Sequence, residues 1–238
     1  MNSRHVLALL HLASPALPVG AFSYSQGLEW EVSCGRIHDE EGVREWLEQL
    51  LQHALACWEA PLVMRLVGAW GELPDPPGQN ENLEANILRW NAEFLAGRET
   101  AELRAETVQM GYSCCRVLPE LFGTHPKLAA GTAVLSLVRE PAYPIVWSLA
   151  AALAGVLPLE AGVAYLWSWL ENQVMAAVKL VPLGQSAGQR LLAALAHRIP
   201  ALADAALTRP ESDWSNLVPG LALASSLHET QYSRLFRS

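Results

Sequence analysis

The stretch LEAGVAYLWSWLENQVMAAVKLV, residues 159–181, decides the fold of this chain. Its apolar residues cover nearly every side of a helix, and a helix that is hydrophobic all round is a buried one. The segment is also long enough to reach across a medium-sized domain. We therefore expect a central helix around which the rest of the chain packs.

Helical patterns continue on both sides of this segment. Alanine and leucine are frequent, and proline or glycine interrupts the chain at helix-sized intervals. No alternating strand pattern, internal repeat or second domain is apparent. The sequence predicts a single all-α domain, residues 1–238, built as a bundle of roughly ten helices. Besides a short amphipathic first helix, the expected helices are residues 24–34, 39–70 with a bend at Pro61, 83–95, 99–118, 127–138, 144–156, 159–181, 183–198 and 200–207, with a loop at 71–82.

Composition limits the possible partners and the compartment. Hydrophobic residues make up 51% and charged residues 17% of the chain, which favours a packed protein over a disordered one. The net charge is −8 and no basic run occurs, so a nucleic-acid partner is not expected. The cysteines lack a disulfide framework and indicate reduced thiols in a cytoplasmic protein. They are Cys34, Cys57, Cys114 and Cys115.

Two apolar stretches resemble membrane signals only superficially. The N-terminal run is interrupted by His11 and followed at once by Pro15, which favours an amphipathic helix over a signal peptide. Residues 141–159 carry no charge, but Pro144 and Pro158 leave too short a helix between them to cross a bilayer. We expect a buried core helix there and no membrane association.

One catalytic pattern competes with a non-enzymatic interpretation. GQSAG, residues 184–188, matches the nucleophile elbow of α/β-hydrolases, and Asp204 and His228 follow Ser186 in the order of a catalytic triad. An α/β-hydrolase-like serine esterase is thus the alternative function. The elbow needs a strand before the serine, whereas the preceding residues continue a helix as far as Pro182. We favour two helices meeting at residues 182–184.

Other chemistry is not indicated. The seven histidines are scattered, and no CxxC, Walker-type or GxGxxG motif occurs. Distant ligands can still converge in a fold, so spacing alone leaves a metal open. We predict no enzyme, no catalytic, metal or cofactor residue, and no bound cofactor. Glu99, Glu102 and Glu106, with Arg98 and Arg104 nearby, are interpreted as a solvated, salt-bridged helix face.

Interaction features remain. Residues 14–20 are expected to form a stiff, extended connector that leads to Tyr24 and Ser25 at a helix start, and taken alone this stretch is equally explained as a turn between two helices. Lys179 lies in an apolar run, where it either snorkels to solvent or contacts a partner. The chain closes on HETQYSRLFRS, residues 228–238, which is rich in residue types favoured at interfaces. Such a segment is expected to dock, on its own body or on another protein.

Three segments together resemble the UreF-type urease accessory proteins. They are SPALPVGAFSYSQGLEW (14–30), NQVMAAVKLVPLGQSAGQ (172–189) and HETQYSRLFRS (228–238). A fourth segment, WNAEFLAGRETAELRAETVQMG (90–111), fits the same family in order and distance. The resemblance spans nearly the whole chain.

This resemblance implies an all-helical, homodimeric chaperone in nickel-enzyme maturation. Proteins of this type bind a UreD- or UreH-type accessory protein, and the pair recruits a UreG-type GTPase onto the urease apoprotein. The assembly delivers nickel to the carbamylated-lysine dinickel centre of urease, and the F-type subunit couples GTP hydrolysis to metal release.

The resemblance also implies which residues bind partners. Residues 209–238 would be a docking tail that becomes ordered when the D/H-type protein binds. Lys179 would couple the GTPase to urease activation, and Tyr24 and Ser25 would lie on the partner-facing surface. The implied partner-binding set is Tyr24, Ser25, Lys179, Gln231, Tyr232, Arg234, Phe236 and Arg237.

Overall fold

The computed structural model describes residues 3–74, 78 and 80–238. These residues form helices and turns and contain no β-strand, which confirms the all-α prediction. When helical segments that follow one another without a break are counted as one helix, the described residues contain ten helices. The expected number of roughly ten is therefore also confirmed.

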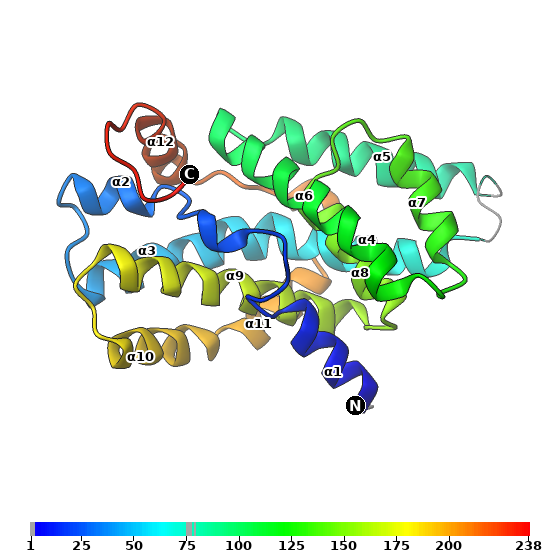
Figure 1. Cartoon of the computed structure of the whole chain (residues 1–238), viewed down its shortest axis with the longest axis horizontal. Helices are drawn as coiled ribbons and strands as arrows, with labels where there is room; N and C mark the ends of the chain where they lie inside the picture. The colour runs from blue at the N-terminus through cyan, green and yellow to red at the C-terminus, as the bar shows by residue number, and fades with distance from the viewer. Residues whose placement is uncertain (1–2, 75–77, 79) are drawn as a thin grey trace.

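Helix α9 (Pro158–Leu180) runs through the middle of the molecule (Figure 1). Pro158 occupies its first turn, and the Glu160 carboxylate accepts the N–H of Leu157 at 3.3 Å, which satisfies that donor at the helix start. Leu166 and Leu170 are completely buried. Each such leucine contributes roughly 1.5–3 kcal/mol of burial free energy, so this helix organises the core as its sequence predicts.

A second long helical run lies beside α9. It consists of α3 (Glu40–Leu50), a π-helical segment (Leu51–Glu59) and α4 (Ala60–Glu72). Asp39 caps its start, as expected, by accepting the N–H of Gly42 at 2.9 Å. Pro61 lies in the first turn of α4, directly after the π-helical segment. The helix type therefore changes just before this proline, and the bend expected there stays a prediction.

Helix α8 (Tyr143–Leu153) packs against α4 and completes the core. The indole N–H of Trp70 donates to Ser148 Oγ at 3.1 Å, and that of Trp147 donates to the carbonyl of Leu12 at 3.2 Å. Both rings are buried with their polar atom satisfied, as a stable core requires.

The remaining helices surround this core. Helix α1 extends away from the body at the N-terminal end, whereas the C-terminal residues lie beside α2 and α12 at the other side (Figure 1). Among the helices that the structure describes, none combines the length and apolar character needed to span a bilayer. The bounds are α1 (Ser3–Leu12), α2 (Leu28–Ser33), α5 (Glu81–Ala96), α6 (Ala101–Phe122), α7 (Leu128–Ser136), α10 (Gln185–Ala196), α11 (Ile199–Leu207) and α12 (Pro219–His228).

Two predicted elements differ from the structure. The helix expected at residues 24–34 begins only at Leu28, because Gln26 and Gly27 take left-handed backbone angles of 50° and 80° in φ. The segment 209–238 is not only a tail, since it contains α12. The loop expected at 71–82 lies between α4 and α5, and residues 75–77 and 79 of it fall outside the described part.

Candidate functional site: the docked C-terminal tail

The C-terminal tail, residues 229–238, lies against the chain's own body. It leaves α12, passes α2 and returns to the residues that precede α2 (Figure 1). Phe236 is 5% exposed and Ser238 is fully buried. The chain itself thus supplies one of the two docks expected for the tail, and the expectation that the tail becomes ordered when the D/H-type partner binds stays a prediction.

Ser238 is the main anchor of the tail. Its main-chain oxygen accepts the Ser25 hydroxyl and the Ser25 N–H at 2.7 Å each, and the Gln26 N–H at 3.1 Å. The left-handed turn at Gln26 and Gly27 aims these donors at one point. A side chain at Gly27 would lie 2.9 Å from the Cβ of Ala224 on α12, so glycine is required there by both conformation and space.

A buried carboxylate receives the Ser238 side chain. The Ser238 hydroxyl donates to Glu106 Oε2 and the Gln26 amide donates to Glu106 Oε1, both at 2.7 Å. The indole of Trp169 on α9 donates to Gln26 Oε1 at 2.8 Å and fixes the amide. Burial raises the pKa of Glu106 to about 7, although the two hydrogen bonds oppose the rise.

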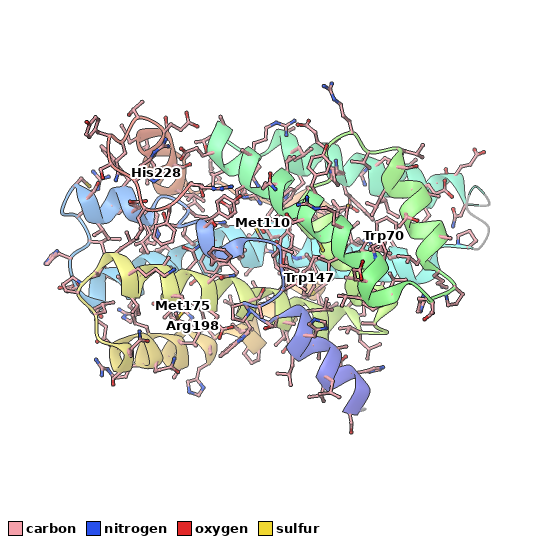
Figure 2. All side chains as sticks on the ribbon, viewed as in Figure 1. Trp70, Met110, Trp147, Met175, Arg198 and His228 are labelled. Carbon is pink, nitrogen blue, oxygen red and sulfur yellow. The ribbon has the colours of Figure 1, made fainter. Side chains whose placement is uncertain are left out.

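His228 forms a second anchor with two further carboxylates. Its ring is fully buried, with Nδ1 2.6 Å from Glu102 Oε2 and Nε2 3.2 Å from Glu29 Oε2. Figure 2 shows His228 at the end of α12, on the side of the molecule where the tail lies. Arg234 also donates to Glu102, at 2.6 Å. Glu102 and Glu106 lie on α6, where the sequence predicts a solvated acidic face. That prediction is wrong for these two residues, because both side chains face the tail.

The Glu29 carboxylate binds the tail backbone directly. It accepts the N–H of Leu235 at 2.6 Å and the N–H of Phe236 at 2.8 Å. The next N–H, of Arg237, donates to the carbonyl of Ser23 at 2.8 Å. Three successive backbone donors of this extended segment are thus satisfied by the body, although the segment belongs to no helix or strand.

The aromatic anchor of the tail points inward. Phe236 is buried, and the Lys179 ammonium lies 5.7 Å from the centre of its ring, within cation–π range. Lys179 itself is exposed on the last turn of α9. Burial and the nearby Glu106 raise the pKa of Tyr24, whose ring is also buried.

The predicted partner-binding residues all lie in this region, but they divide into two groups. Tyr24, Ser25 and Phe236 are buried and hold the tail. The exposed group comprises Lys179, Tyr232, Arg234 and Arg237, and Gln231 is half-buried. Exposed apolar side chains on the tail and on neighbouring elements lie in the same region as this exposed group. They are Phe22, Met175, Leu223, Leu227 and Leu235.

Sequence reasoning missed Glu29, Glu102 and Glu106 as parts of this site. A glutamate near an arginine is most simply a surface ion pair, and only the tertiary fold buries Glu29 and Glu106 and half-buries Glu102 against the tail. A usable signal was the combination of a histidine and an arginine in the tail with no acidic partner close by except Glu229. These two side chains need hydrogen-bond acceptors from elsewhere in the chain.

A polar cavity of about 60 Å³ lies behind the tail site and shares Gln26 and Glu106 with it. In its wall, the Arg98 guanidinium lies 2.5 Å from the Glu59 carboxylate, and both side chains are nearly fully buried. The Tyr165 hydroxyl donates to Glu59 at 2.7 Å. Arg98, predicted on a solvated face, instead stabilises the interior, with its charge stacked 4.1 Å above the Phe94 ring.

The residues of the alternative catalytic triad are not assembled. Ser186 is exposed in the first turn of α10, and α9 precedes it where the elbow needs a strand. Asp204 lies exposed on α11, and both His228 nitrogens are engaged by glutamates. Within the described residues, no group of three or more histidine, cysteine or acidic side chains is arranged to hold a metal.

The four segments on which the family resemblance rests meet at the tail. Residues 14–30 supply Ser25 and Gln26, residues 90–111 supply Glu102 and Glu106, and residues 172–189 supply Lys179. Each of them contacts residues 228–238 directly or through one hydrogen bond. Segments far apart in sequence thus form one surface.

Comparison with known proteins agrees with the family resemblance of these segments. The UreF family model matches residues 37–196. The chain is 55% identical to the urease accessory protein UreF of Azoarcus sp., covering 98% of this chain and 95% of that protein. It is 54% identical to the UreF protein of Dechloromonas aromatica, with 97% and 96% covered. It also matches a bifunctional urease accessory protein UreEF of Bordetella bronchiseptica at 47% identity, over all of this chain and 53% of the relative. The chain belongs to the UreF family of urease accessory proteins.

Proposed function

We propose that this chain is a non-enzymatic adaptor that joins other accessory proteins to the urease apoprotein while nickel is inserted. In this account it binds a UreD- or UreH-type protein, and together they recruit and regulate a UreG-type GTPase. The observation that carries the proposal is the convergence of all four family-like segments on the docked tail. A surface built from distant segments, with exposed aromatic and arginine side chains, is suited to binding a protein partner.

The two groups of tail residues have different roles in this proposal. Tyr232 is fully exposed, and the exposed Arg234 and Arg237 flank the buried Phe236. These exposed side chains would contact the D/H-type partner. Tyr24, Ser25 and Phe236 would act by holding the tail in position, and the half-buried Gln231 would bind at the edge of the contact.

Lys179 is assigned to coupling between the GTPase and urease activation. It is exposed beside the tail, at the end of the central helix, where one partner could sense the binding of another. The matched control is Lys127, on the connection to α7, whose ammonium donates to the carbonyl of Gly71. Lys179→Ala should lower urease activation and change GTP turnover in the assembled complex, whereas Lys127→Ala should change neither. Normal activation and turnover in Lys179→Ala would remove this assignment.

The remaining parts of the proposal concern assembly and location. We infer a homodimeric, single-domain protein that acts in the cytoplasm, as the family resemblance implies. Equilibrium ultracentrifugation of the purified chain tests the dimer directly. A monomer at all accessible concentrations would contradict that part without affecting the adaptor role.

Urease maturation in cells tests the whole proposal. Urease subunits are co-expressed with the D/H-type and G-type accessory proteins, with and without this chain, and the purified urease is assayed for nickel content and urea hydrolysis. We expect both to fall to background without the chain and to recover when it is supplied. Equal nickel loading in its absence would refute the proposed function, as would turnover of a substrate by the purified chain alone.

A further inference from the structure

The central helix α9 carries a column of polar side chains on one face. Tyr165, Trp169 and Gln173 follow one another at four-residue spacing, which places them on the same side of a helix. Tyr165 donates to Glu59 at 2.7 Å, and Trp169 donates to Gln26 at 2.8 Å. Gln173 is 2% exposed, yet its side-chain oxygen has no hydrogen-bond partner among the described residues. The column therefore ends on a buried oxygen that still needs a donor.

A second buried atom near this column needs an acceptor. The Arg98 guanidinium pairs with Glu59, but its Nε atom has no partner in the described part of the chain. Both Gln173 and Arg98 line the polar cavity of about 60 Å³ that lies behind the tail. A buried polar atom without a partner is destabilising, so two such atoms in the wall of one cavity indicate an occupant that completes their hydrogen bonds.

The two atoms define the chemistry of the occupant. The Gln173 oxygen requires a donor, whereas the Arg98 Nε–H requires an acceptor. An anion in the cavity would lie beside Glu59 and Glu106, and a cation would lie beside Arg98, so the surroundings favour neither charge. A neutral molecule that both donates and accepts hydrogen bonds satisfies both atoms.

The size of the cavity selects water. A buried water needs about 10–15 Å³ of such volume, so the cavity of about 60 Å³ accommodates roughly four to six molecules. A smaller cavity of about 10 Å³ shares Gln26, Glu59 and Arg98 with it and has room for about one more. The polar wall offers each of these molecules the several partners that a buried water requires.

We propose that this cavity is a binding site for a cluster of ordered water molecules, held by Gln173 and Arg98, which connects the central helix to the tail through Glu106. Glu106 lines the same cavity, and its two carboxylate oxygens accept the Ser238 hydroxyl and the Gln26 amide. A carboxylate offers about four acceptor positions, so Glu106 can also accept a bond from the cluster. The central helix, the interior ion pair and the tail then form one hydrogen-bonded unit.

A high-resolution crystal structure of the wild-type chain tests the site directly. We expect several water molecules in the cavity, one within about 3.2 Å of Gln173 Oε1 and one within about 3.2 Å of Arg98 Nε. An empty cavity would overturn the proposal. A single larger molecule that bridges the two side chains would overturn it as well.

The sign of a change in stability provides an independent test in solution. Gln173→Met keeps an unbranched side chain of similar length and removes the amide. If water binds the amide, the substitution loses a hydrogen bond, and the equilibrium constant for unfolding should rise roughly two- to tenfold. The control is Gln49→Met, at an exposed position of α3, which should change this constant little. A constant that falls or stays the same in Gln173→Met would show that no water binds the amide and would overturn the proposal.

Cleavage of the tail by trypsin tests the connection through Glu106. In Gln173→Met the cluster loses one of its binding groups, so Glu106 loses water-mediated support and the tail should loosen. Under conditions in which the helical spectrum shows a folded chain, cleavage after Arg234 should accelerate about two- to tenfold, whereas Gln49→Met should keep the wild-type rate. Equal rates in the two variants would overturn the connection to the tail. Because all three tests use the chain alone, their failure would leave the proposed function standing.

Discussion

Ser25 and Ser238, 213 positions apart in the chain, are joined by a hydrogen bond of 2.7 Å between the Ser25 hydroxyl and the Ser238 main-chain oxygen. The Ser25 hydroxyl also accepts the N–H of Glu29 at 3.3 Å. One buried side chain therefore links the turn before α2, the start of that helix and the end of the tail. A substitution of Ser25 can therefore test the docking of the tail separately from the stability of the helical body.

Ser25→Ala should loosen the tail and leave the helical body intact. The substitution removes one buried hydrogen bond to Ser238 while the two backbone donors remain, so tail docking should weaken by about 1 kcal/mol. Trypsin cleavage after Arg234 and Arg237 reports on docking, and we expect it to accelerate roughly fivefold. The control is Ser33→Ala, which removes only an exposed bond to Trp30. Equal cleavage rates in the two variants would contradict the anchoring role.

Glu106 should make the stability of the fold depend on pH. Its pKa is about 7 in the folded chain, against an ordinary value of 4.5. Between these values the folded chain holds a proton that the unfolded chain has lost. The free energy of unfolding therefore falls as pH rises through the window and stays low above it.

The corresponding measurement is urea unfolding from about pH 5 to 8 of the wild-type chain and Glu106→Gln. The neutral glutamine should remove a decrease on the order of 3 kcal/mol. Glu120→Gln, at an exposed position of α6, is the control and should follow the wild type. If Glu106→Gln kept the wild-type slope, the protonated carboxyl in the interior would be ruled out.

The sequence predicts the fold correctly where the apolar spacing of a segment matches the face that the segment buries in the structure. The central helix and the cap at Asp39 follow from apolar spacing and from a single residue type. Helix α12 was missed because the serine, asparagine, proline and glycine before it resemble the start of a disordered tail. The late start of α2 depends on a left-handed Gln26, a conformation that sequence does not favour.

The candidate site was predictable only in part, for a physical reason. Interface-type residues such as Tyr232 and Arg234 stand out by composition, and they do lie at the tail. Their acidic counterparts, Glu29 and Glu102, have no distinctive sequence context. A carboxylate acquires its role from groups brought to it by the fold, and those groups are more than a hundred residues away.

The buried ion pair of Glu59 and Arg98 should matter far more than an exposed pair. Glu59→Ala leaves the Arg98 charge buried without its partner and also removes the acceptor of Tyr165. We expect a loss of about 3–5 kcal/mol in the free energy of unfolding, measured by denaturant titration. Glu93→Ala breaks the exposed pair with Arg89 and should cost less than about 1 kcal/mol. Similar losses in the two variants would show that the interior pair is solvated.

The central claim is that the tail joins this chain to its accessory partner. Its most direct test is a chain lacking residues 231–238, compared with the full chain by circular dichroism and by co-purification with the D/H-type protein. Since the deleted residues form no helix, the helical spectrum should be unchanged, and the partner should no longer be retained. A truncated chain that folds and still retains the partner at the level of the full chain would contradict the account.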